Sequence, residues 1–341
     1  MIKEAIRKLV DRDGLSVQEA VAAMTEIMDG EATPAQISCF ITALRMKGET
    51  VDEITGFVQV MREKSIRVSS SRSPLVDTCG TGGDMLNTFN ISTTAAFVVA
   101  GAGVAVAKHG NRAASSICGS ADVLEALGVN ITIGPDRVGK CIDEAGIGFM
   151  FAPAAHPAMK HAVGPRKEIG IRTVFNILGP MTNPAGASRQ LIGVFSPAVT
   201  ETMANVLANL GSERAMVVHG LDGLDEISTI GASRISELRD GKVTTYEFDC
   251  SQAGLSSCTA ESINGGDTPQ ENADMLLSVL NGEPGPRRDI VLLNAGAAIY
   301  VAGAAEDLRE GITMAATSID SGAALNALNT MKTISKDGDG T

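Results

Sequence analysis

Tryptophan is absent from this sequence of 341 residues, and aromatic residues make up only 3% of it. The core must therefore be built from aliphatic residues and alanine, and a hydrophobic content of 44% is enough for a large one. The 37 glycines agree with this, because glycine lets helices and strands approach closely. The length suits two domains or one large domain.

Long basic runs are missing as well, and the formal net charge is −12. We therefore expect neither nucleic acid nor an anionic membrane as a partner, and an anionic ligand would need a local basic pocket. The 6 cysteines show no C-x-x-C spacing, which indicates reduced thiols in a cytoplasmic protein rather than a disulfide framework. No unbroken apolar run of about 18 residues occurs, so no membrane span is expected.

Helix patterns fill the first part of the chain. Cap signals at Ser16, Thr33 and Thr50 each mark a helix start. We predict a small all-helical N-terminal domain over residues 1–68, and the serine-rich stretch 69–74 is predicted to be a hinge.

Short apolar runs alternate with helix patterns over residues 75–335, which predicts a larger α/β domain with a mostly parallel central sheet. One of these runs, 131–133, is predicted to be a strand, and two helices are predicted over 287–301 and 305–332. Asp240-Gly241 lies between two strand-like runs and predicts a hairpin.

A glycine turn at residues 80–84 follows a short apolar run and precedes an apolar helix that we expect Ser92 to cap. Such a turn exposes backbone N–H groups and the positive end of a helix dipole, which together bind phosphate. The alternative is a turn that only reverses the chain. Residues 88–94 contain more polar side chains than the single one that a helix cap needs, and this favours the phosphate site.

A second polar loop follows a buried-looking strand at residues 104–107 and contains Lys108 and Arg112. Ligand loops lie at the carboxyl ends of strands in open α/β sheets, although an ordinary solvated loop is the alternative. Hydroxyl groups of Ser115, Ser116 and Ser120 come next. His109 is interpreted as a hydrogen-bonding group rather than as a general base.

A locally basic segment covers residues 155–172. The spacing of His156 and His161 does not place both on one helix face, so a zinc site is not favoured. One of its arginines could hold a substrate carboxylate through two hydrogen bonds, while a charged helix surface is the alternative.

An acidic loop with Asp222, Asp225 and Glu226 follows the strand at residues 215–219. Beside a phosphate site these carboxylates would repel the ligand unless a cation lay between them. Mg²⁺ suits that role, since it takes one or two carboxylates together with phosphate oxygens and water. A polar turn with an exposed acidic edge is the alternative.

A resemblance to the anthranilate phosphoribosyltransferase family is carried by several segments in one order: DTCGTGGD, NTFNIST, KHGNRAASS, GSADVLEALG, GPRKEIGIRTVFNILGPMTNP and GLDEIS. The family transfers the phosphoribosyl group of phosphoribosyl diphosphate (PRPP) to the amine of anthranilate, giving N-(5-phosphoribosyl)anthranilate and diphosphate in tryptophan biosynthesis. The resemblance implies a nucleoside phosphorylase type of fold, with a small helical domain hinged to an α/β domain. It also implies Mg²⁺ as cofactor and a homodimer joined through the helical domains.

The resemblance also implies roles for individual residues. It implies a PRPP site made of Gly80, Gly83, Asp84, Thr88, Asn90, Ile91, Ser92, Thr93, Lys108, His109, Gly110, Asn111, Arg112, Ala113, Ala114, Ser115, Ser116 and Ser120. It implies an anthranilate site with Gly80, Asn111 and Arg166, and Mg²⁺ ligands Ser92, Asp225 and Glu226. Residues 179–184 would shape the entrance for the aromatic acid, and helices from about 160 to 190 would join the helical domain.

Met85 departs from the family, where glycine is common at this place, and leaves the shape of the turn open. No catalytic acid or base is expected, because the amine of anthranilate is neutral at pH 7 and needs no deprotonation before attack. Catalysis would rest on positioning and electrostatics. Two rivals are a nucleoside phosphorylase of the same fold, which needs no Mg²⁺, and a non-catalytic relative that binds nucleotide or nucleic acid.

Overall fold

A computed structural model of the chain describes residues 1–84, 86–113 and 117–336. The N-terminal layer consists of helices α1 (Ile2–Val10), α2 (Val17–Met28), α3 (Pro34–Lys47) and α4 (Val51–Glu63). The predicted caps are confirmed: Ser16, Thr33 and Thr50 each form a capping box with the residue three positions later. These caps satisfy N–H groups that the first helical turn would otherwise leave unpaired.

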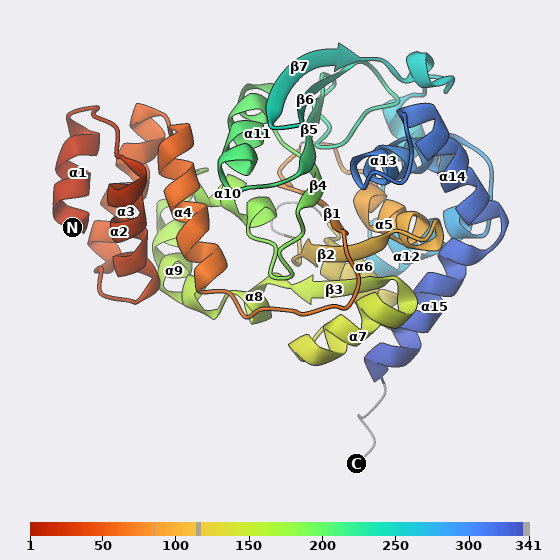
Figure 1. Cartoon of the computed structure of the whole chain (residues 1–341), viewed down its shortest axis with the longest axis horizontal. Helices are drawn as coiled ribbons and strands as arrows, with labels where there is room; N and C mark the ends of the chain where they lie inside the picture. Colours follow the sequence, from red (N-terminus) through yellow and green to blue (C-terminus); the bar gives the residue numbers. More distant parts are fainter. Residues whose placement is uncertain (85, 114–116, 337–341) are drawn as a thin grey trace.

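The helical layer gains further helices from the middle of the chain. These are α9 (Lys160–Ile169) and α10 (Phe175–Leu178), whereas the short helix α8 (Ala152–Ala155) packs beside β3. Helix α9 packs against α2 and α3, so segments far apart in the sequence lie side by side (Figure 1). Phe40 and Phe57 meet edge to face at 5.8 Å in this layer, and Ala162, Phe175 and Leu178 belong to the same core.

The strands of the described residues form one seven-stranded sheet in the order β3-β2-β1-β4-β5-β6-β7. Their bounds are β1 (Leu75–Gly80), β2 (Ala105–Gly110), β3 (Ile147–Phe151), β4 (Arg189–Gly193), β5 (Arg214–Gly220), β6 (Ser233–Arg239) and β7 (Lys242–Phe248). Strands β1 to β5 are mutually parallel, while β6 runs antiparallel to both of its neighbours, β5 and β7. The predicted hairpin is confirmed, with Asp240 at φ 52° and Gly241 at φ 71° between β6 and β7.

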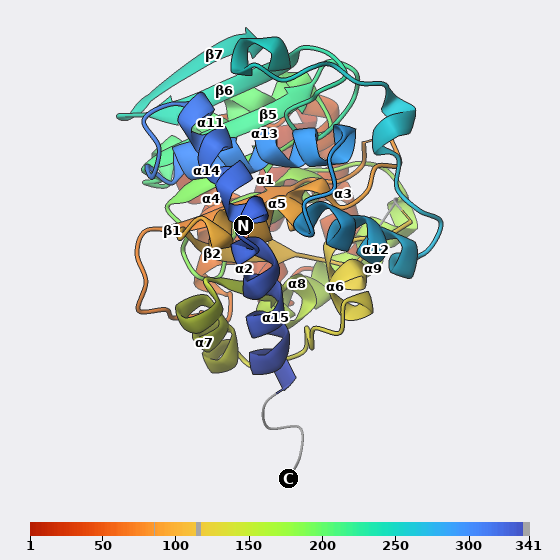
Figure 2. The ribbon, with the colours of Figure 1, turned by 90° about the vertical axis from the view of Figure 1, so that its right-hand side faces the viewer.

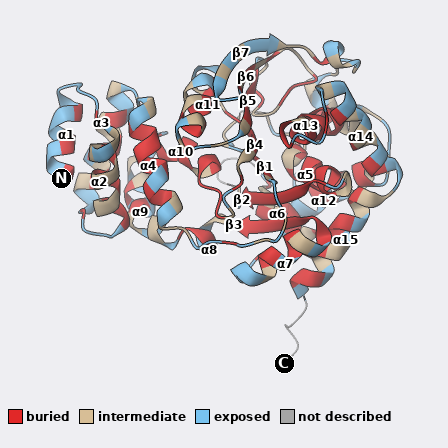
Figure 3. Ribbon diagram, viewed as in Figure 1, coloured by how far each residue is buried: buried red, intermediate tan, exposed pale blue. Residues whose placement is uncertain are grey.

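Both faces of the sheet are covered. One face packs on α5 and α13 and the other on α11, and Met216 and Val217 of β5 accordingly point to different cores. Buried residues concentrate in the central strands and in α5 and α13 (Figure 3), and α15 runs along the outside of the same layer (Figure 2). The remaining helices are α5 (Ile91–Gly101), α6 (Ser120–Ala126), α7 (Pro135–Ala145), α11 (Thr200–Asn209), α12 (Pro269–Leu280), α13 (Pro286–Val301), α14 (Leu308–Asp320) and α15 (Ala323–Lys336).

Three local expectations were wrong. Helix α5 begins two residues earlier than expected, with Asn90 rather than Ser92 at its N-cap, and Ser92 lies inside its first turn. Residues 131–133 form no strand: Ile131 buries its side chain in the core, but the segment pairs with no neighbouring strand. The helix expected over 305–332 is divided into α14 and α15, because Gly322 has φ 77° and ends the regular path.

The fold class is therefore confirmed as an N-terminal helical bundle with a larger α/β unit. None of the described helices is long and apolar enough to cross a membrane.

Candidate active site

The predicted polar segments meet at one edge of the sheet. Parallel strands bring their carboxyl ends to the same edge, and the strand order changes direction between β1 and β4. Such a change leaves a crevice outside the strand ends, which is the usual ligand site of an open α/β sheet. The glycine turn follows β1, the basic loop follows β2 and the acidic loop follows β5.

The acidic loop lies directly on two glycines of neighbouring strands. The N–H of Gly82 donates to Asp225 Oδ2 at 2.9 Å. A Cβ atom at Gly193 would lie 1.6 Å from the carbonyl oxygen of Asp225, and one at Gly80 would lie 2.7 Å from Asp225 Oδ2. At Gly193 only glycine permits this approach, because the crowding atoms are backbone, whereas at Gly80 they belong to the side chain of Asp225.

Carboxyl groups of Asp84, Asp225 and Glu226 lie close together here. Burial and the charge of Asp225 raise the pKa of Asp84 to about 7, and these two groups share a hydrogen bond. Burial also raises the pKa of Asp225, and burial with the charge of Asp225 raises that of Glu226. Carboxylates forced together in this way are stabilised by a cation among them.

A buried lysine faces the same cluster from β2. Lys108 is only 2% exposed, and its Nζ donates to the carbonyl of Thr78 and to Ser92 Oγ at 3.4 Å. Burial lowers its pKa, and the charges of Asp77 and Glu226 act in the opposite direction. Lys108 thus supplies a fixed positive charge at the start of α5.

The predicted Mg²⁺ ligands are brought together. The carboxylate of Glu226 accepts a hydrogen bond from the backbone of Ser92, next to Asp225. Among the described residues, no group of three or more His, Cys, Asp or Glu side chains could hold a metal without further ligands. Two carboxylates and a hydroxyl fit Mg²⁺, because this ion completes its coordination with water and phosphate oxygens.

The start of α5 contributes mainly through its backbone. Ile91 and Thr93 are 2% and 1% exposed, so their side chains belong to the core rather than to a ligand surface. Asn90 Nδ2 donates to the carbonyl of Cys118 at 3.0 Å, and its buried Oδ1 has no partner in the described residues. Thr88 forms an isolated bridge with Asn264.

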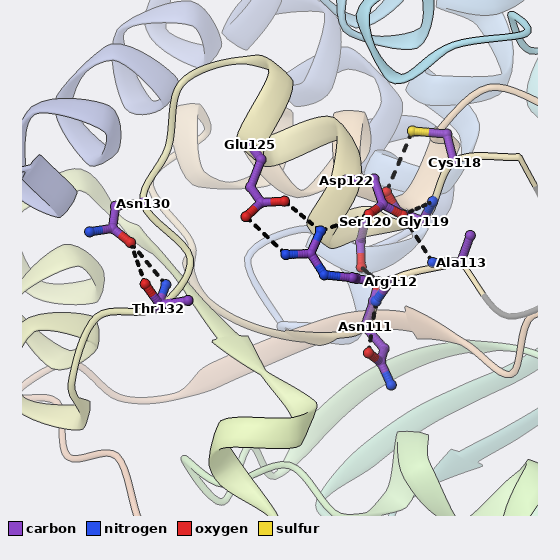
Figure 4. A network of polar contacts seen from close by, with 10 residues as sticks. All are labelled: Asn111, Arg112, Ala113, Cys118, Gly119, Ser120, Asp122, Glu125, Asn130 and Thr132. Atoms are coloured by element: carbon purple, nitrogen blue, oxygen red, sulfur yellow. Dashed lines mark hydrogen bonds and ion pairs between the residues drawn. The ribbon is translucent and has the colours of Figure 1, made fainter.

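The basic loop is tied to α6 (Figure 4). Arg112 forms ion pairs with Asp122 at 3.0 Å and with Glu125, and its guanidinium also stacks on Phe151. It is therefore turned toward α6 and its charge is already matched. The N–H of Ala113 donates to Asp122 Oδ2 at 3.0 Å, so residues 112 and 113 are both tied to the start of the helix.

Asn111 and Ser120 join the two ends of this loop, since Ser120 Oγ donates to the carbonyl of Asn111 at 3.1 Å. Close packing also explains the glycine at position 110, because a Cβ atom there would lie 2.3 Å from Ser120 Oγ. The predicted ligands Ala114, Ser115 and Ser116, and Met85 of the glycine turn, lie outside the described residues.

Two histidines, which the sequence did not indicate to be neighbours, lie together beside the basic loop. The rings of His109 and His156 are 5.1 Å apart, and the buried Nε2 atom of each has no partner in the described residues. Burial lowers the pKa of His109 to about 3 and that of His156 to about 4, so both are neutral at pH 7. A signal was available, because His109 is the last residue but one of β2, and His156 follows the neighbouring strand β3 after the short helix α8.

The two arginines of the basic segment have different surroundings. Arg166 stacks on Phe175 at 5.1 Å, burial lowers its pKa, and it has no acidic partner in the part of the chain described. Arg172 donates to the carbonyl of Gly83 at 2.5 Å and stacks on Phe195 at 4.5 Å. Arg172 therefore holds the glycine turn, a role that the sequence did not suggest, while Arg166 keeps an unmatched charge.

The predicted entrance segment is anchored beneath this site. Asn183 Nδ2 donates to Asp77 Oδ2 at 2.7 Å and to the carbonyl of Ala107 at 2.8 Å. The other oxygen of Asp77 accepts from the N–H of His109 at 3.1 Å. One buried carboxylate thus links β1, β2 and the entrance segment.

The helical layer and the mostly parallel sheet with a polar crevice at its switch point agree with the family comparisons, which place the chain among the glycosyl transferases. Residues 3–65 match the helical bundle domain of the glycosyl transferase family, and residues 72–325 match its a/b domain. Within this class, the chain belongs to the anthranilate phosphoribosyltransferase family, as the sequence predicted.

Relatives and solved structures support this placement. The anthranilate phosphoribosyltransferase of Symbiobacterium thermophilum is 58% identical over 97% of each chain, and that of Acetivibrio thermocellus is 56% identical over 96% of this chain and 95% of the relative. The structure of the Thermus thermophilus enzyme has a TM-score of 0.92 at 44% identity, covering 97% of this chain and 99% of its own. The Saccharomyces cerevisiae enzyme in complex with PRPP and Mg has a TM-score of 0.88 at 29% identity, covering 98% of this chain and 97% of its own.

Proposed function

We propose that this protein transfers the phosphoribosyl group of PRPP to the amine of anthranilate, forming N-(5-phosphoribosyl)anthranilate and diphosphate in tryptophan biosynthesis. The observation that carries the proposal is the meeting of Asp225 and Glu226 with Ser92 and Lys108 at the switch point of the sheet. Relatives that share more than half of the residues carry the name of this activity.

The donor site would hold diphosphate between the glycine turn and the start of α5. Backbone N–H groups and the helix dipole attract its charge, and Lys108 adds a cation that cannot move away from its buried position. Mg²⁺ held by Ser92, Asp225 and Glu226 would neutralise diphosphate as it leaves. The loop after β2, together with Ser120, would bind the ribose and its phosphate.

The acceptor site would use Arg166 for the carboxylate of anthranilate. An unpaired and partly buried guanidinium gains most from a carboxylate, because two parallel hydrogen bonds can form. Gly80 and Asn111 would complete the site, and the neutral rings of His109 and His156 offer Nε2 atoms for hydrogen bonds.

Chemistry at this site needs no proton abstraction before attack. Breaking the bond between ribose C1 and diphosphate builds positive charge on the ribose, and the neutral amine of anthranilate attacks that carbon. The nitrogen then loses one proton to diphosphate or to water. The residues described here bind both substrates, orient them and neutralise charge, which is the largest contribution expected in such a site. No side chain is assigned as catalytic acid or base.

We also propose a homodimer joined through the helical layer. A groove of about 400 Å³ on α1 and α3 is lined by Leu9, Val10, Arg12, Ser38, Cys39, Thr42, Ala43, Met46 and Lys47. Val10 and Met46 are 63% and 71% exposed, which is unfavourable for apolar side chains in water. A second copy of this surface would cover them.

Domain closure and location complete the proposal. Residues 1–68, together with helices between about 160 and 190, would move as one unit against the rest of 75–335, with residues 69–74 as a hinge. The free cysteines and the tryptophan pathway support a location in the cytoplasm.

The first experiment is loss of anthranilate fluorescence with purified protein, PRPP and Mg²⁺, with EDTA as control. Rapid loss that EDTA abolishes supports both the reaction and the metal site. Folded protein that leaves anthranilate unchanged would contradict the proposal. Phosphorolysis of a nucleoside without Mg²⁺ would indicate the phosphorylase instead.

A further inference from the structure

Helix α13 contains a buried polar side chain in an apolar setting. Its residues from Ile290 to Ile299 are all buried, and Asn294 in the middle is 0% exposed. An amide at such a place costs free energy unless its hydrogen bonds are satisfied. Its partners therefore indicate why the helix carries it.

Asn294 binds both backbone groups of one residue in the acidic loop. Its Oδ1 accepts from the N–H of Ile227 at 3.0 Å, and its Nδ2 donates to the carbonyl of Ile227 at 2.9 Å. A further bond from Nδ2 reaches the carbonyl of Ile290 at 2.9 Å in its own helix. The side chain is thereby fixed by α13 and fixes the peptide groups on either side of Ile227.

Ile227 directly follows Glu226, so this contact bears on the acidic pair. The peptide group held through the N–H of Ile227 includes the carbonyl of Glu226. Leu224 and Ile227 are both 0% exposed and anchor the loop on either side of Asp225 and Glu226. Rotation at Ile227 would swing the Glu226 carboxylate away from Ser92.

The other end of the loop has its own support. Asp222 Oδ2 accepts from Ser228 Oγ at 2.5 Å, and Asp222 Oδ1 accepts from the N–H of Leu224 at 3.1 Å. These bonds close the loop on itself. The contact with Asn294 is different, because it ties the loop to a helix in the core.

We propose that Asn294 is a positioning residue that sets the place of Asp225 and Glu226 for a divalent cation bound with diphosphate. The proposal rests on the metal role in the proposed function. Residues that orient metal ligands commonly change metal affinity by about 10–100-fold when they are replaced. Asn294 itself touches neither substrate nor metal and acts through the backbone of the loop.

The chain offers a matched control on α12. Asn272 is 2% exposed, its Oδ1 accepts from the N–H of Gly266 at 3.4 Å, and its Nδ2 donates to the carbonyls of Gly266 and Thr268. The pattern of bonds is the same as that of Asn294, but the residue it holds is not in the acidic loop. Replacement of Asn272 therefore reproduces the loss of a buried amide without touching the acidic pair.

The test measures binding of Mn²⁺ together with inorganic diphosphate by isothermal titration calorimetry, with the Mn²⁺–diphosphate complex formed before it is added, because diphosphate itself binds Mn²⁺. We expect Asn294→Leu to raise the dissociation constant of Mn²⁺ at least tenfold, and Asn272→Leu to change it less than twofold. Both variants should lower the unfolding temperature to a similar degree. The Mg²⁺ concentration for half-maximal activity should rise only in Asn294→Leu, with kcat at saturating Mg²⁺ reduced less than threefold.

Equal Mn²⁺ affinity in wild type and Asn294→Leu would overturn the proposal, as would an equal loss in both variants. If Asn294→Leu does not fold, Asn294→Ala and Asn272→Ala replace the pair, with the same outcomes required. Wild-type protein that turns over PRPP while the variants bind Mn²⁺ normally would leave the proposed function intact and reject only the role of Asn294. Wild-type protein that binds no Mn²⁺ with diphosphate would reject the metal site on which both rest.

Discussion

Gly193 sets how closely the acidic loop can approach the sheet. It ends β4 beside Gly80 of β1, and the backbone of Asp225 occupies the space in which a side chain would begin. Lys108 is the second residue on which the site depends, because its buried side chain places a cation there that solvent screens little. At the scale of single residues, the site depends on the absence of a side chain at Gly193 and on the fixed position of the charge of Lys108.

Gly193→Ala should displace the loop, because a Cβ atom would lie 1.6 Å from the carbonyl oxygen of Asp225. We expect a loss of about 1–3 kcal/mol in the free energy of unfolding, typical of an overfilled site, and a higher Mg²⁺ requirement. Urea denaturation and Mg²⁺ titration of activity measure both. Gly134→Ala is the control, since Gly134 has φ −69° and no atom within 4 Å of the added methyl group. Equal behaviour of the two variants would contradict the prediction.

Arg166→Gln should weaken anthranilate recognition, because it removes the unmatched cation assigned to the substrate carboxylate. A hydrogen bond to a charged group contributes about 1.5–3 kcal/mol, so the KM for anthranilate should rise roughly ten- to a hundredfold. The KM for PRPP should stay nearly constant. Steady-state kinetics with each substrate varied measures this.

Lys167→Gln is the matched control for Arg166, since it removes an exposed charge from the next position of α9. Aniline, which lacks the carboxylate, provides a second control as acceptor. An equal loss with aniline and with anthranilate would show that Arg166 does not bind the carboxylate.

At the scale of elements, local signals predicted much of the fold. Capping boxes, the proline at the start of α3 and the Asp240-Gly241 turn act within a few residues, so they can be recognised without tertiary contacts. The failures have a different origin. Ile131 is buried as a strand residue would be and Ile133 is half-buried, but a strand also needs a neighbouring strand. Ser92 was expected at the cap rather than inside α5, because serine and asparagine are equally suitable cap residues and Asn90 takes the position.

The His109–His156 pair joins β2 to the start of the helical layer and gives this junction a pH dependence. Burial holds the pKa of His156 at about 4, below the ordinary value of 6.5. The unfolded chain therefore binds more protons than the folded protein between these values, so the contribution of His156 to the free energy of unfolding falls as the pH drops. From pH 7 to pH 5 the loss is about 2 kcal/mol.

His156→Gln should show a correspondingly smaller fall in stability over the same interval. Burial raises the pKa of Asp77 to about 6 and changes stability in the opposite direction, but Asp77 is present in both proteins and its effect cancels in the comparison. Urea denaturation of ligand-free protein at pH 7, 6 and 5 measures the difference. Parallel curves for the two proteins would contradict the prediction.

At the scale of the whole molecule, the site is an assembly of distant segments. The bond between Gly82 and Asp225 joins residues 143 positions apart, and no local pattern specifies it. Strand-end loops could be predicted to gather at one edge, but not that Arg172 holds the glycine turn or that Arg112 pairs with α6. The family resemblance implied which segments form the site, whereas these contacts depend on packing that only the folded chain defines.

The oligomeric state is decided at the same scale, by the exposed apolar surface of α1 and α3. Met46→Asp places a charge in the groove that a second copy would cover, and burying an unpaired charge there is costly. We expect wild-type protein to be a dimer and Met46→Asp to be mostly monomeric, measured by sedimentation velocity at micromolar concentration. Ile66→Asp is the control, because Ile66 is 44% exposed but lies outside α1 and α3.

A monomeric wild-type protein, or a dimer that survives Met46→Asp, would contradict the interface. The same variant separates assembly from chemistry, because the groove and the switch point of the sheet lie on different units of the fold. A monomer that retains kcat would show that each chain holds a complete site. A monomer with a raised KM for anthranilate alone would instead indicate that the dimer fixes the helical layer, which carries Arg166 on α9, against the sheet.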